Sequence, residues 1–554
     1  MENISKISYL KGDTSSPLIH SNMGEFLDNA VKKFGPRTAI VSVLQNHRFS
    51  YKELHSQVIK ASKALIAKGI KSGDRVGVWS TNRSEWIILQ FAVSRIGAIL
   101  VHINPAYKEN ELEYTVNHSD CQILFLTPKF RAYDCLNFAV SVQSRQSCLK
   151  LIVDFDDTDS THKENKSLMS WGDFLLNSDQ ITETRLETFV SNVDAKSAAS
   201  IQYTSGTTGH PKGATLSQHN MLNNANQIGL RFGFIPSDII CLPVPMFHCF
   251  GSVVGVLAAF AQGASIVFPS ESFDAEQAIK VIDSEKCTVF YGVPMMYIAI
   301  LNHPSFSTER MKTLRTGMMG ASPCPSEVFK DAIEKMHMIG LCSSYGMTET
   351  SPLSLQCLPQ QSVEQRANTV GVVHPHIEIK IIDPQDGSTV ALGQPGELCV
   401  RGYSVMLGYW NNPEATQSAI DEEGWMHSGD LAQIREDGCV CIVGRIKDMV
   451  IRAGENIYPR EIEEFFHQLP EIADAQVFGV PDSLYGEQLA AWIKLKPGHQ
   501  LDIEDLKSRC KGKISSFKIP HYIKFVDEYP STASGKVQKF RMRQMVIDEF
   551  ELKE

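Results

Sequence analysis

Residues 203–213 read Tyr-Thr-Ser-Gly-Thr-Thr-Gly-His-Pro-Lys-Gly, a stretch in which hydroxyl side chains are interspersed with glycines and which contains a single lysine. Glycines let a backbone approach an anion closely, and hydroxyl groups donate hydrogen bonds to phosphate oxygens. A Walker loop counted from Gly206 would need Gly-Lys-Ser/Thr where the chain has Pro-Lys-Gly, so that motif is excluded. The stretch predicts a phosphate-binding loop of another kind, the alternative being a polar surface turn. Its expected members are Thr204, Ser205, Gly206, Thr207, Thr208, Gly209, His210, Pro211 and Lys212.

The chain on both sides of this loop alternates strands with helices. An apolar strand is expected over 199–203, and Ser217 is a predicted N-cap of the helix that follows the loop. Nearer the N-terminus, a capping box of Ser50 and Glu53 opens a helix, and a strand is expected over 75–79. This alternation predicts an α/β fold with doubly wound parallel sheets, in which ligands bind beyond the strand ends.

The C-terminal part has a different pattern. Between about 370 and 443, short strands separated by Gly, Pro and Asp turns predict a small distorted β-barrel. After residue 448 comes a compact α+β unit of about a hundred residues. Because 554 residues exceed what one core usually organises, we expect a large domain at 1–444, a hinge at 445–448 and a small mobile domain at 449–554.

Composition limits the class of partner. The chain carries 53 Lys and Arg against 63 Asp and Glu, a formal charge of -10, which argues against a nucleic acid held by its phosphates. The 13 cysteines form no Cys-x-x-Cys pair and suit reduced thiols rather than a disulfide framework or a metal site. The most apolar stretch, 253–268, is too short for a membrane span and is predicted to be a buried helix followed by a strand.

Several further motifs along the chain point to the same group of proteins as the loop. Together they resemble adenylate-forming (AMP-binding) enzymes, the superfamily of acyl-CoA synthetases, luciferases and the adenylation domains of peptide synthetases. The stretches 401–410 and 511–520 are most similar to medium-chain fatty acyl-CoA ligases. The matching motifs, in chain order, lie at 203–213, 320–323, 345–350, 409–410, 425–430, 444–448, 454–459 and 534–536.

The resemblance implies an activity and its cofactors. A carboxylic acid, expected to be a medium-chain fatty acid, would react with ATP to give an acyl-adenylate and then with CoA to give a thioester, releasing AMP and pyrophosphate. Loop residues 204–212 would hold the β- and γ-phosphates, and Glu349 would bind Mg²⁺. Lys536 would stabilise charge at the α-phosphate, and His248 would lie near the substrate carboxylate. Each of these residues could instead have an ordinary structural role.

The resemblance also assigns the nucleoside and the second substrate. Asp430 would accept hydrogen bonds from the ribose hydroxyls, with Arg445 nearby, and Lys447 would be the hinge about which the small domain moves. The apolar run 291–296 would line the acyl pocket, or could be core. Adenine-site candidates are Gly320, Ala321, Ser322 and Tyr345, and Gly346 and Thr348 are further expected members of the ATP site. Candidates for CoA are Gly454, Glu455, Asn456, Lys511 and Lys513.

Other functions remain open at this level. A luciferase-like oxidoreductase forms the same adenylate, a non-catalytic nucleotide-binding protein would keep part of the motif set, and aryl or short-chain acids could replace the medium-chain acid. No secretory or Arg-rich transit segment is visible, so a cytoplasmic location is expected, while the resembled family suggests the mitochondrial matrix as an alternative. Whether the protein is a monomer or a homo-oligomer stays open.

Overall fold

A computed structural model describes residues 7–156, 167–204, 211–322, 324–453, 455–531 and 537–552. The chain divides into two compact units. The large unit comprises Lys11–Glu378 and Val400–Met426, and the small unit comprises Met1–Leu10, Ile379–Cys399 and His427–Glu554. We describe each unit by itself.

The first sheet of the large unit has eight strands in the order β10-β9-β6-β4-β5-β11-β12-β22. Strands β9, β6, β4, β5 and β11 are mutually parallel, as the alternating pattern predicts, whereas β12 and β22 run antiparallel to their neighbours. The strands are β4 (Arg75–Trp79), β5 (Ile99–Ile103), β6 (Cys121–Leu126), β9 (Leu151–Asp154), β10 (Leu168–Ser170), β11 (Ala198–Thr204), β12 (Lys212–Ser217) and β22 (Gly408–Tyr409).

The second sheet has nine strands in the order β19-β18-β17-β16-β15-β13-β14-β2-β3. Its central strands are parallel and buried, so their ends form two distinct edges. The strands are β2 (Thr38–Ser42), β3 (His47–Ser50), β13 (Ile239–Cys241), β14 (Ser265–Phe268), β15 (Val289–Gly292), β16 (Thr316–Met319), β17 (Gly340–Gly346), β18 (Leu353–Gln356) and β19 (Val372–Val373). A separate two-stranded pair consists of β7 (Lys129–Phe130) and β8 (Tyr133–Asp134).

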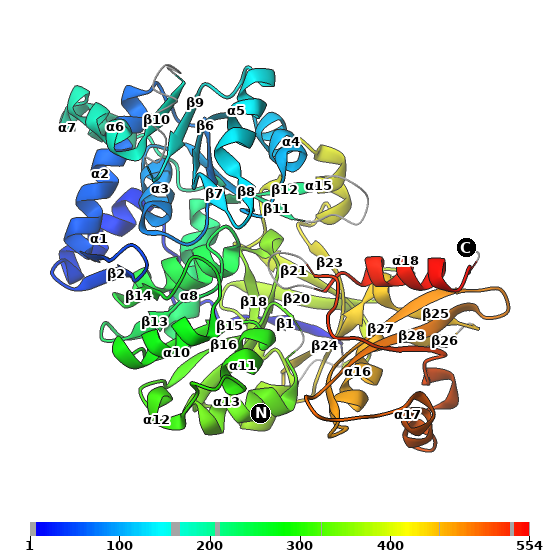
Figure 1. The fold of residues 1–554 in the computed structure, drawn as a ribbon. Helices are drawn as coiled ribbons and strands as arrows, with labels where there is room; N and C mark the ends of the chain where they lie inside the picture. The colour runs from blue at the N-terminus through cyan, green and yellow to red at the C-terminus, as the bar shows by residue number, and fades with distance from the viewer. Residues whose placement is uncertain are drawn as a thin grey trace. The chain divides into compact units, whose positions relative to one another are not determined.

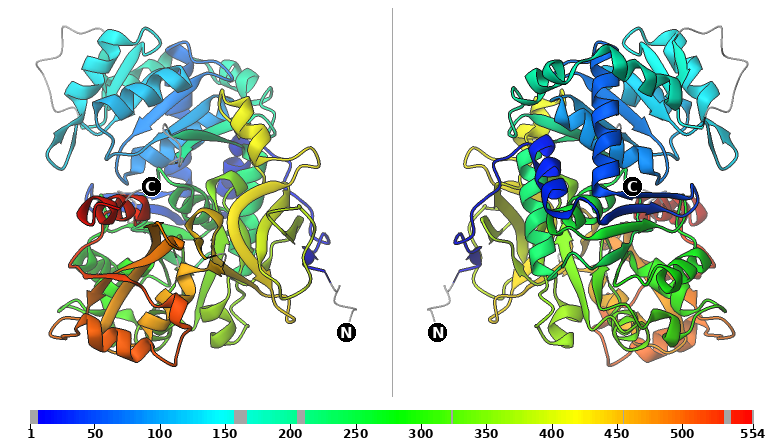
Figure 2. Two further views of the ribbon diagram at one scale, coloured as in Figure 1. Left: turned by 90° about the vertical axis from the view of Figure 1, so that its right-hand side faces the viewer. Right: turned by 90° about the vertical axis from the view of Figure 1, so that its left-hand side faces the viewer.

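Helices cover both sheets of the large unit. The first three pack against one another, and their blue ribbons lie together in Figures 1 and 2. The predicted capping box is present at the start of α2, where Ser50 and Glu53 bond to each other's backbone N–H groups. The helices are α1 (Met23–Phe34), α2 (Tyr51–Ala67), α3 (Ser84–Arg95), α4 (Glu109–Ser119), α5 (Cys135–Arg145), α6 (Trp171–Leu176), α7 (Glu183–Val190), α8 (Gln218–Arg231), α9 (Ala258–Gln262), α10 (Ala275–Ser284), α11 (Pro294–Leu301), α12 (Thr308–Met311), α13 (Ser326–Lys335), α14 (Val363–Asn368) and α15 (Pro413–Ala419).

The phosphate-loop region differs from the sequence prediction in one respect. The strand over 198–204 and the helix capped by Ser217 are both present, but β12 lies between the loop and the helix. The sequence 212–217 carries only a short apolar alternation, which the nearby N-cap signal obscured. The loop therefore closes an antiparallel hairpin, with Thr204 paired to Lys212.

A five-stranded sheet in the order β1-β20-β21-β23-β24 occupies the region of the predicted barrel. Most of its residues belong to the small unit. Its strands are β1 (Tyr9–Lys11), β20 (Ile377–Ile382), β21 (Gly396–Gly402), β23 (Met426–Ile434) and β24 (Val440–Arg445).

The remainder of the small unit is a second five-stranded sheet with helices on both faces. Alternate residues of β27 (Ile472–Asp482) and β28 (Gly486–Leu495) belong to two different apolar clusters, as the period of a strand requires. One cluster includes α16 (Pro459–His467) and α17 (Ile503–Cys510), and the other includes α18 (Lys539–Glu549). Figure 1 accordingly shows α17 and α18 on opposite sides of these strands. The other strands are β25 (Val450–Arg452), β26 (Glu455–Ile457) and β29 (Tyr522–Phe525).

A lysine anchors the start of α18. Lys539 Nζ donates to Glu463 Oε1 over 2.6 Å and to Val477 O over 2.9 Å. Just before it, Ser531 and Val537 form an antiparallel bridge.

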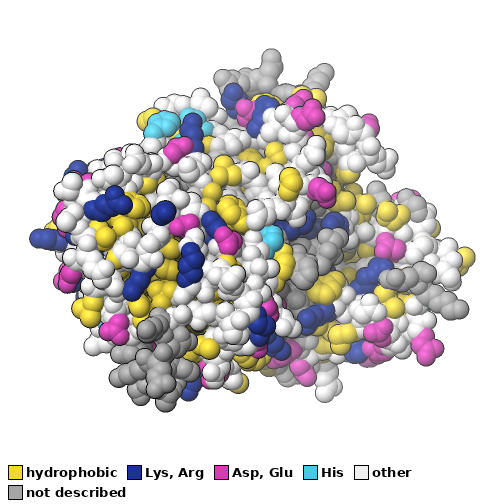
Figure 3. Space-filling view, turned by 90° about the horizontal axis from the view of Figure 1, so that it is seen from above, with side chains coloured by type: hydrophobic (Ala, Val, Ile, Leu, Met, Phe, Trp, Pro, Cys, Tyr) yellow, Lys and Arg dark blue, Asp and Glu magenta, His cyan; other side chains and the backbone are white. Residues whose placement is uncertain are grey.

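Two surface properties bear on the class of protein. Among the described residues, no helix combines the length and the apolar character that crossing a bilayer requires. On the face shown in Figure 3, basic and acidic side chains are both spread among polar and apolar ones.

Candidate functional site

Thr204 and Lys212 mark the two ends of the predicted phosphate loop. Ser205, Gly206, Thr207, Thr208, Gly209 and His210 lie outside the described residues. Thr204 Oγ1 lies 3.4 Å from Lys212 O and 3.2 Å from Glu349 Oε1. The Lys212 ammonium lies 5.1 Å from the centroid of the Tyr409 ring. The hairpin therefore places a hydroxyl beside the carboxylate of Glu349 and a cation beside the ring of Tyr409.

Glu349 lies in a short 3₁₀ turn, Thr348–Thr350, directly after β17, and is buried. Its Oε1 accepts a 2.9 Å hydrogen bond from the Tyr409 hydroxyl in addition to that from Thr204. Its backbone carbonyl accepts from Met406 N over 2.9 Å. Burial, with the Glu349 carboxylate adding to it, raises the pKa of Tyr409 well above its usual range. The tyrosine therefore stays a neutral hydrogen-bond donor to an acceptor-only carboxylate.

His248 lies one residue before a buried cysteine that touches the same turn. Phe250 N donates to His248 Nδ1 over 3.1 Å, so a neutral His248 carries its proton on Nε2. Cys249 Sγ lies 3.6 Å from both His248 Nδ1 and Thr348 Oγ1. Burial and the Glu349 carboxylate raise the pKa of Cys249 to about 12, so the thiol is neutral. This thiol links the His248 segment to the turn that carries Glu349.

The adenine-site candidates lie at one edge of the nine-stranded sheet. Gly320, Ala321 and Ser322 follow β16, and Tyr345 and Gly346 end β17, its parallel neighbour. The carboxyl ends of parallel neighbours meet at the same edge, where Thr348 and Glu349 also lie. Ala321 and Ser322 are exposed, and Tyr345 is half-buried. At Gly346 a Cβ would collide with the carbonyl of Pro352, which accounts for the glycine.

In the small unit, Asp430 and Arg445 form an ion pair across neighbouring strands. They are partners in the antiparallel register of β23 and β24, and Arg445 Nε lies 2.8 Å from Asp430 Oδ1. The Asp430 side chain is 8% exposed and that of Arg445 is 51% exposed. A buried carboxylate is therefore paired with a half-exposed guanidinium.

The other predicted residues of the small unit are more dispersed. Lys447 lies in the 3₁₀ turn Ile446–Asp448 and is exposed, as are Glu455, Lys511 and Lys513. Asn456 pairs through its backbone with Ile451. Gly454 and Lys536 lie outside the described residues.

Sequence reasoning missed a cluster of Glu397, Cys399 and His427. The ligand-type atoms of these three side chains lie within 4.8 Å of one another. Glu397 and Cys399 project from the same face of β21, and His427 belongs to the adjacent strand β23. Glu397 and Cys399 are two residues apart in the sequence, which could have indicated that both side chains lie on one face of a strand. Their proximity to His427 could not be read from the sequence, because it depends on the pairing of strands about thirty residues apart.

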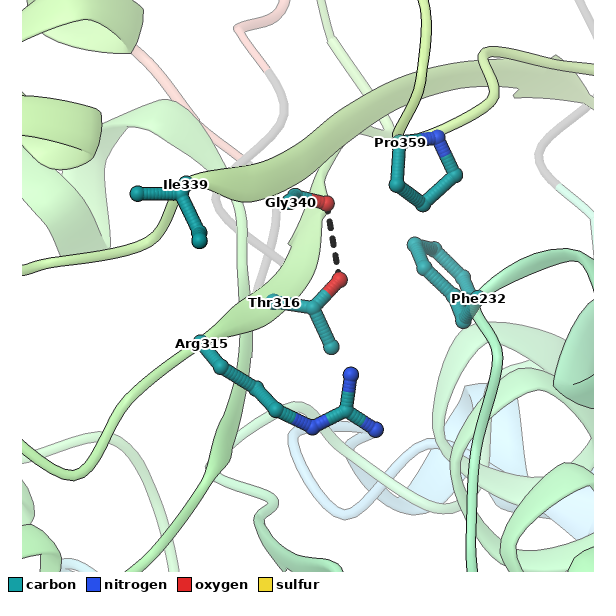
Figure 4. Close-up of a pocket in the computed structure, with 6 residues that line it drawn as sticks. All are labelled: Phe232, Arg315, Thr316, Ile339, Gly340 and Pro359. Atoms are coloured by element: carbon teal, nitrogen blue, oxygen red, sulfur yellow. Dashed lines mark hydrogen bonds between the residues drawn. The ribbon is translucent and has the colours of Figure 1, made fainter.

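The described part of the large unit has hollows in at least two places. One, of about 240 Å³, is lined by Phe232, Arg315, Thr316, Ile339, Gly340 and Pro359, and Figure 4 shows the hydrogen bond from Thr316 Oγ1 to Gly340 O that spans it. It lies at the amino ends of β16 and β17, opposite the edge that carries the adenine-site candidates. The other, of about 280 Å³, borders the phosphate loop and is lined by Tyr114, His118, Pro211, Lys212, Gly213, Trp410 and Asn412.

Comparison with known proteins gives consistent matches over the whole chain. Residues 27–410 match the AMP-binding enzyme family, and residues 461–536 match the AMP-binding enzyme C-terminal domain. YngI of Bacillus subtilis is 42% identical over 97% of this chain and 99% of its own length. The mitochondrial medium-chain acyl-CoA ligase ACSF2 of Rattus norvegicus is 39% identical over 99% of this chain and 91% of its own length.

Solved structures show the same architecture. ATP-bound MatB from Rhodopseudomonas palustris has a TM-score of 0.82 and 26% identity, covering 96% of this chain and all of its own. The anthranilate CoA ligase AuaEII in complex with anthranoyl-AMP has a TM-score of 0.86 at 24% identity, covering 97% of this chain and 99% of its own, which bears on the fold alone. The predicted adenylate-forming fold is confirmed.

Proposed function

This chain belongs to the AMP-binding enzyme family, and we propose that it is an AMP-forming ligase that converts a medium-chain fatty acid to its CoA thioester. A carboxylate oxygen attacks the α-phosphorus of ATP, the bond to pyrophosphate breaks, and an acyl-adenylate forms. The CoA thiol, losing its proton, then attacks the acyl carbon, and AMP leaves. The named ACSF2 relative supports the acyl class, since it is similar to this chain over almost its whole length.

One observation carries the ATP-dependent step. The hydroxyl of Thr204, at the start of the phosphate loop, and that of Tyr409 converge on Glu349 Oε1, with Lys212 beside the Tyr409 ring. A buried carboxylate held by two hydroxyl donors is suited to a phosphate–metal site, because it supplies anionic oxygen without reorganising.

Mg²⁺ fits the donor set at this position. Hard oxygen ligands are present in Glu349 and Thr204, and Mg²⁺ typically takes one or two protein oxygens together with substrate phosphates. When bound, it would offset the negative charge of the phosphates. The chain's own part is to orient Glu349, to hold phosphates at Thr204 and Lys212, and to keep His248 close to the same turn through Cys249.

The remaining assignments complete the proposal. Lys536 stabilises charge at the α-phosphate, Asp430 and Arg445 bind the ribose, and the edge formed by residues 320–322 and 345–346 receives adenine. Lys447 serves as the hinge, and Glu455, Lys511 and Lys513 remain candidates for CoA, together with Gly454 and Asn456. A cytoplasmic location stays a prediction, with the mitochondrial name of the ACSF2 relative favouring the matrix instead.

The test is exchange of labelled pyrophosphate into ATP with saturated acids of graded length, followed by CoA thioester formation. We expect exchange to require an acid and to be fastest at medium length. Exchange without any acid would refute the ligase, and equal rates with short, medium, long and aryl acids would refute only the assigned length. Light emission with luciferin, ATP and oxygen would support the luciferase alternative.

A further inference from the structure

We propose that Glu397 is a positioning residue that fixes the segment 427–430 and thereby aims the Asp430 carboxylate at the ribose hydroxyls. This inference rests on the proposed role of Asp430 in nucleotide binding. Glu397 does not need to touch the nucleotide itself, because its two oxygens are both used on the segment that carries Asp430.

Glu397 holds this segment at two points. Its Oε1 accepts a hydrogen bond from Gly429 N over 3.0 Å, and its Oε2 lies 3.0 Å from His427 Nδ1. The two anchored residues lie one and three positions before Asp430. Glu397 is only 9% exposed, and it projects from β21, the strand beside β23. A buried carboxylate on one strand therefore fixes the backbone of the next.

The local backbone makes such an anchor necessary. Gly429 has φ of +68°, a left-handed conformation in the middle of β23, so this peptide does not follow the regular strand ladder. Its N–H donates to the side chain of Glu397. On its other side, Asp430 N donates a 3.1 Å hydrogen bond to the Ser428 hydroxyl oxygen. Rotation of the peptide at Gly429 would turn the Asp430 side chain, whose Oδ1 is paired with Arg445 Nε.

His427 completes the arrangement. Its Nδ1 also lies 3.7 Å from Cys399 Sγ, so the imidazole packs between a carboxylate and a thiol on the same strand. These three groups are also potential zinc ligands. In our proposal they are held by hydrogen bonds, with Nδ1–H of His427 directed at Glu397, and no metal is required for the segment to keep its shape.

The experiment compares ATP with 2′-deoxy-ATP in Glu397 variants of the full chain. Glu397→Ala removes both anchors, and we expect the KM for ATP to rise roughly 10- to 100-fold, the range for losing a hydrogen bond to a charged group. The preference for ATP over 2′-deoxy-ATP should fall by a similar factor, with kcat changed much less. Glu397→Gln keeps an oxygen acceptor for Gly429 N and should recover most of this preference.

The small unit offers a matched control. His467 Nε2 and Asp474 Oδ1 form another histidine–carboxylate pair, also at 3.0 Å, between α16 and β27. Asp474→Ala should keep both the wild-type KM and the wild-type nucleotide preference. A general loss of stability would affect both variants alike, whereas a positioning role affects only the Glu397 variant.

Three results would overturn the proposal. The first is a Glu397→Ala enzyme with unchanged nucleotide preference, and the second is a fall in kcat that is equal for both nucleotides and is not recovered in Glu397→Gln. The third is one equivalent of zinc in the purified protein that disappears in Cys399→Ser. Calorimetric binding of ATP and 2′-deoxy-ATP in the absence of any acid distinguishes a failure of this inference from a failure of the proposed acid specificity.

Discussion

The hydroxyl of Tyr409 allows the role of Glu349 to be tested in isolation. Tyr409→Phe removes the 2.9 Å donor to Glu349 Oε1 but keeps the ring that lies beside Lys212. A hydrogen bond to a charged group contributes about 1.5–3 kcal/mol, and groups that orient a metal ligand typically change metal affinity by about 10- to 100-fold. We therefore expect half-maximal activity to need roughly 10 to 100 times more free Mg²⁺.

The assay is acid-dependent pyrophosphate exchange measured across free Mg²⁺ concentrations at fixed ATP. If the hydroxyl acts through Glu349, high Mg²⁺ should restore most of the exchange rate. Tyr51→Phe is a suitable control, because it also removes a buried phenol hydroxyl, which donates to Ala264 O over 2.7 Å, and Tyr51 belongs to α2. That variant should lose some stability and keep its Mg²⁺ requirement.

An unchanged Mg²⁺ requirement in Tyr409→Phe would refute the reasoning about Glu349. A loss of exchange that no Mg²⁺ concentration relieves would also contradict it. In that case Tyr409 would act on the hairpin, since β22 pairs with β12 directly beside the phosphate loop.

Three further predictions concern other parts of the chain. Lys536→Ala should slow adenylation by about 100- to 1000-fold while thioester formation from supplied acyl-AMP survives; equal loss of both half-reactions would indicate a structural role. Lys447→Pro should block one half-reaction in single-turnover measurements while Lys447→Ala is nearly neutral, and normal acyl transfer in the proline variant would remove Lys447 as the hinge. Burial opposes ionisation of Asp28, but hydrogen bonds from His55 and Arg95 outweigh it and lower its pKa to about 2. The ionised Asp28 should contribute about 2 kcal/mol to the free energy of unfolding above pH 4, and this contribution should disappear as pH falls from 4 to 2. In urea unfolding, Asp28→Asn should therefore be less stable than the wild type at pH 7 and almost equally stable at pH 2. A stability difference that does not change with pH would contradict this.

Local signals predicted the elements that begin or end on strong sequence features. The Ser50–Glu53 capping box and the strand Arg75–Trp79 match the structure, because caps and buried apolar runs act over a few residues. Strand β12 was missed because a hairpin partner is defined by pairing with β11 and not by its own six residues. Helix α18 carries only a weak sequence signal, because only three of its residues are buried: Met542, Val546 and Ile547.

In the candidate site, too, some residues could be predicted from the sequence and others could not. Motif residues such as Glu349 and Asp430 could be named from the chain, since the resemblance depends on short contiguous stretches. The groups that hold them could not, because Tyr409 is sixty residues from Glu349 and Glu397 is about thirty from the segment it anchors. Such contacts follow from strand order, and strand order is not written in any one segment.

The anchor at Lys539 ties the start of α18 to two other elements of the small unit. Its ammonium joins the first residue of this helix to Glu463 of α16 and to Val477 of β27. Any large displacement of α18 must therefore carry α16 and β27 with it. Because Lys536 precedes this anchor by only three positions in the sequence, its proposed role at the α-phosphate would depend on the position of the small-unit sheet as a whole.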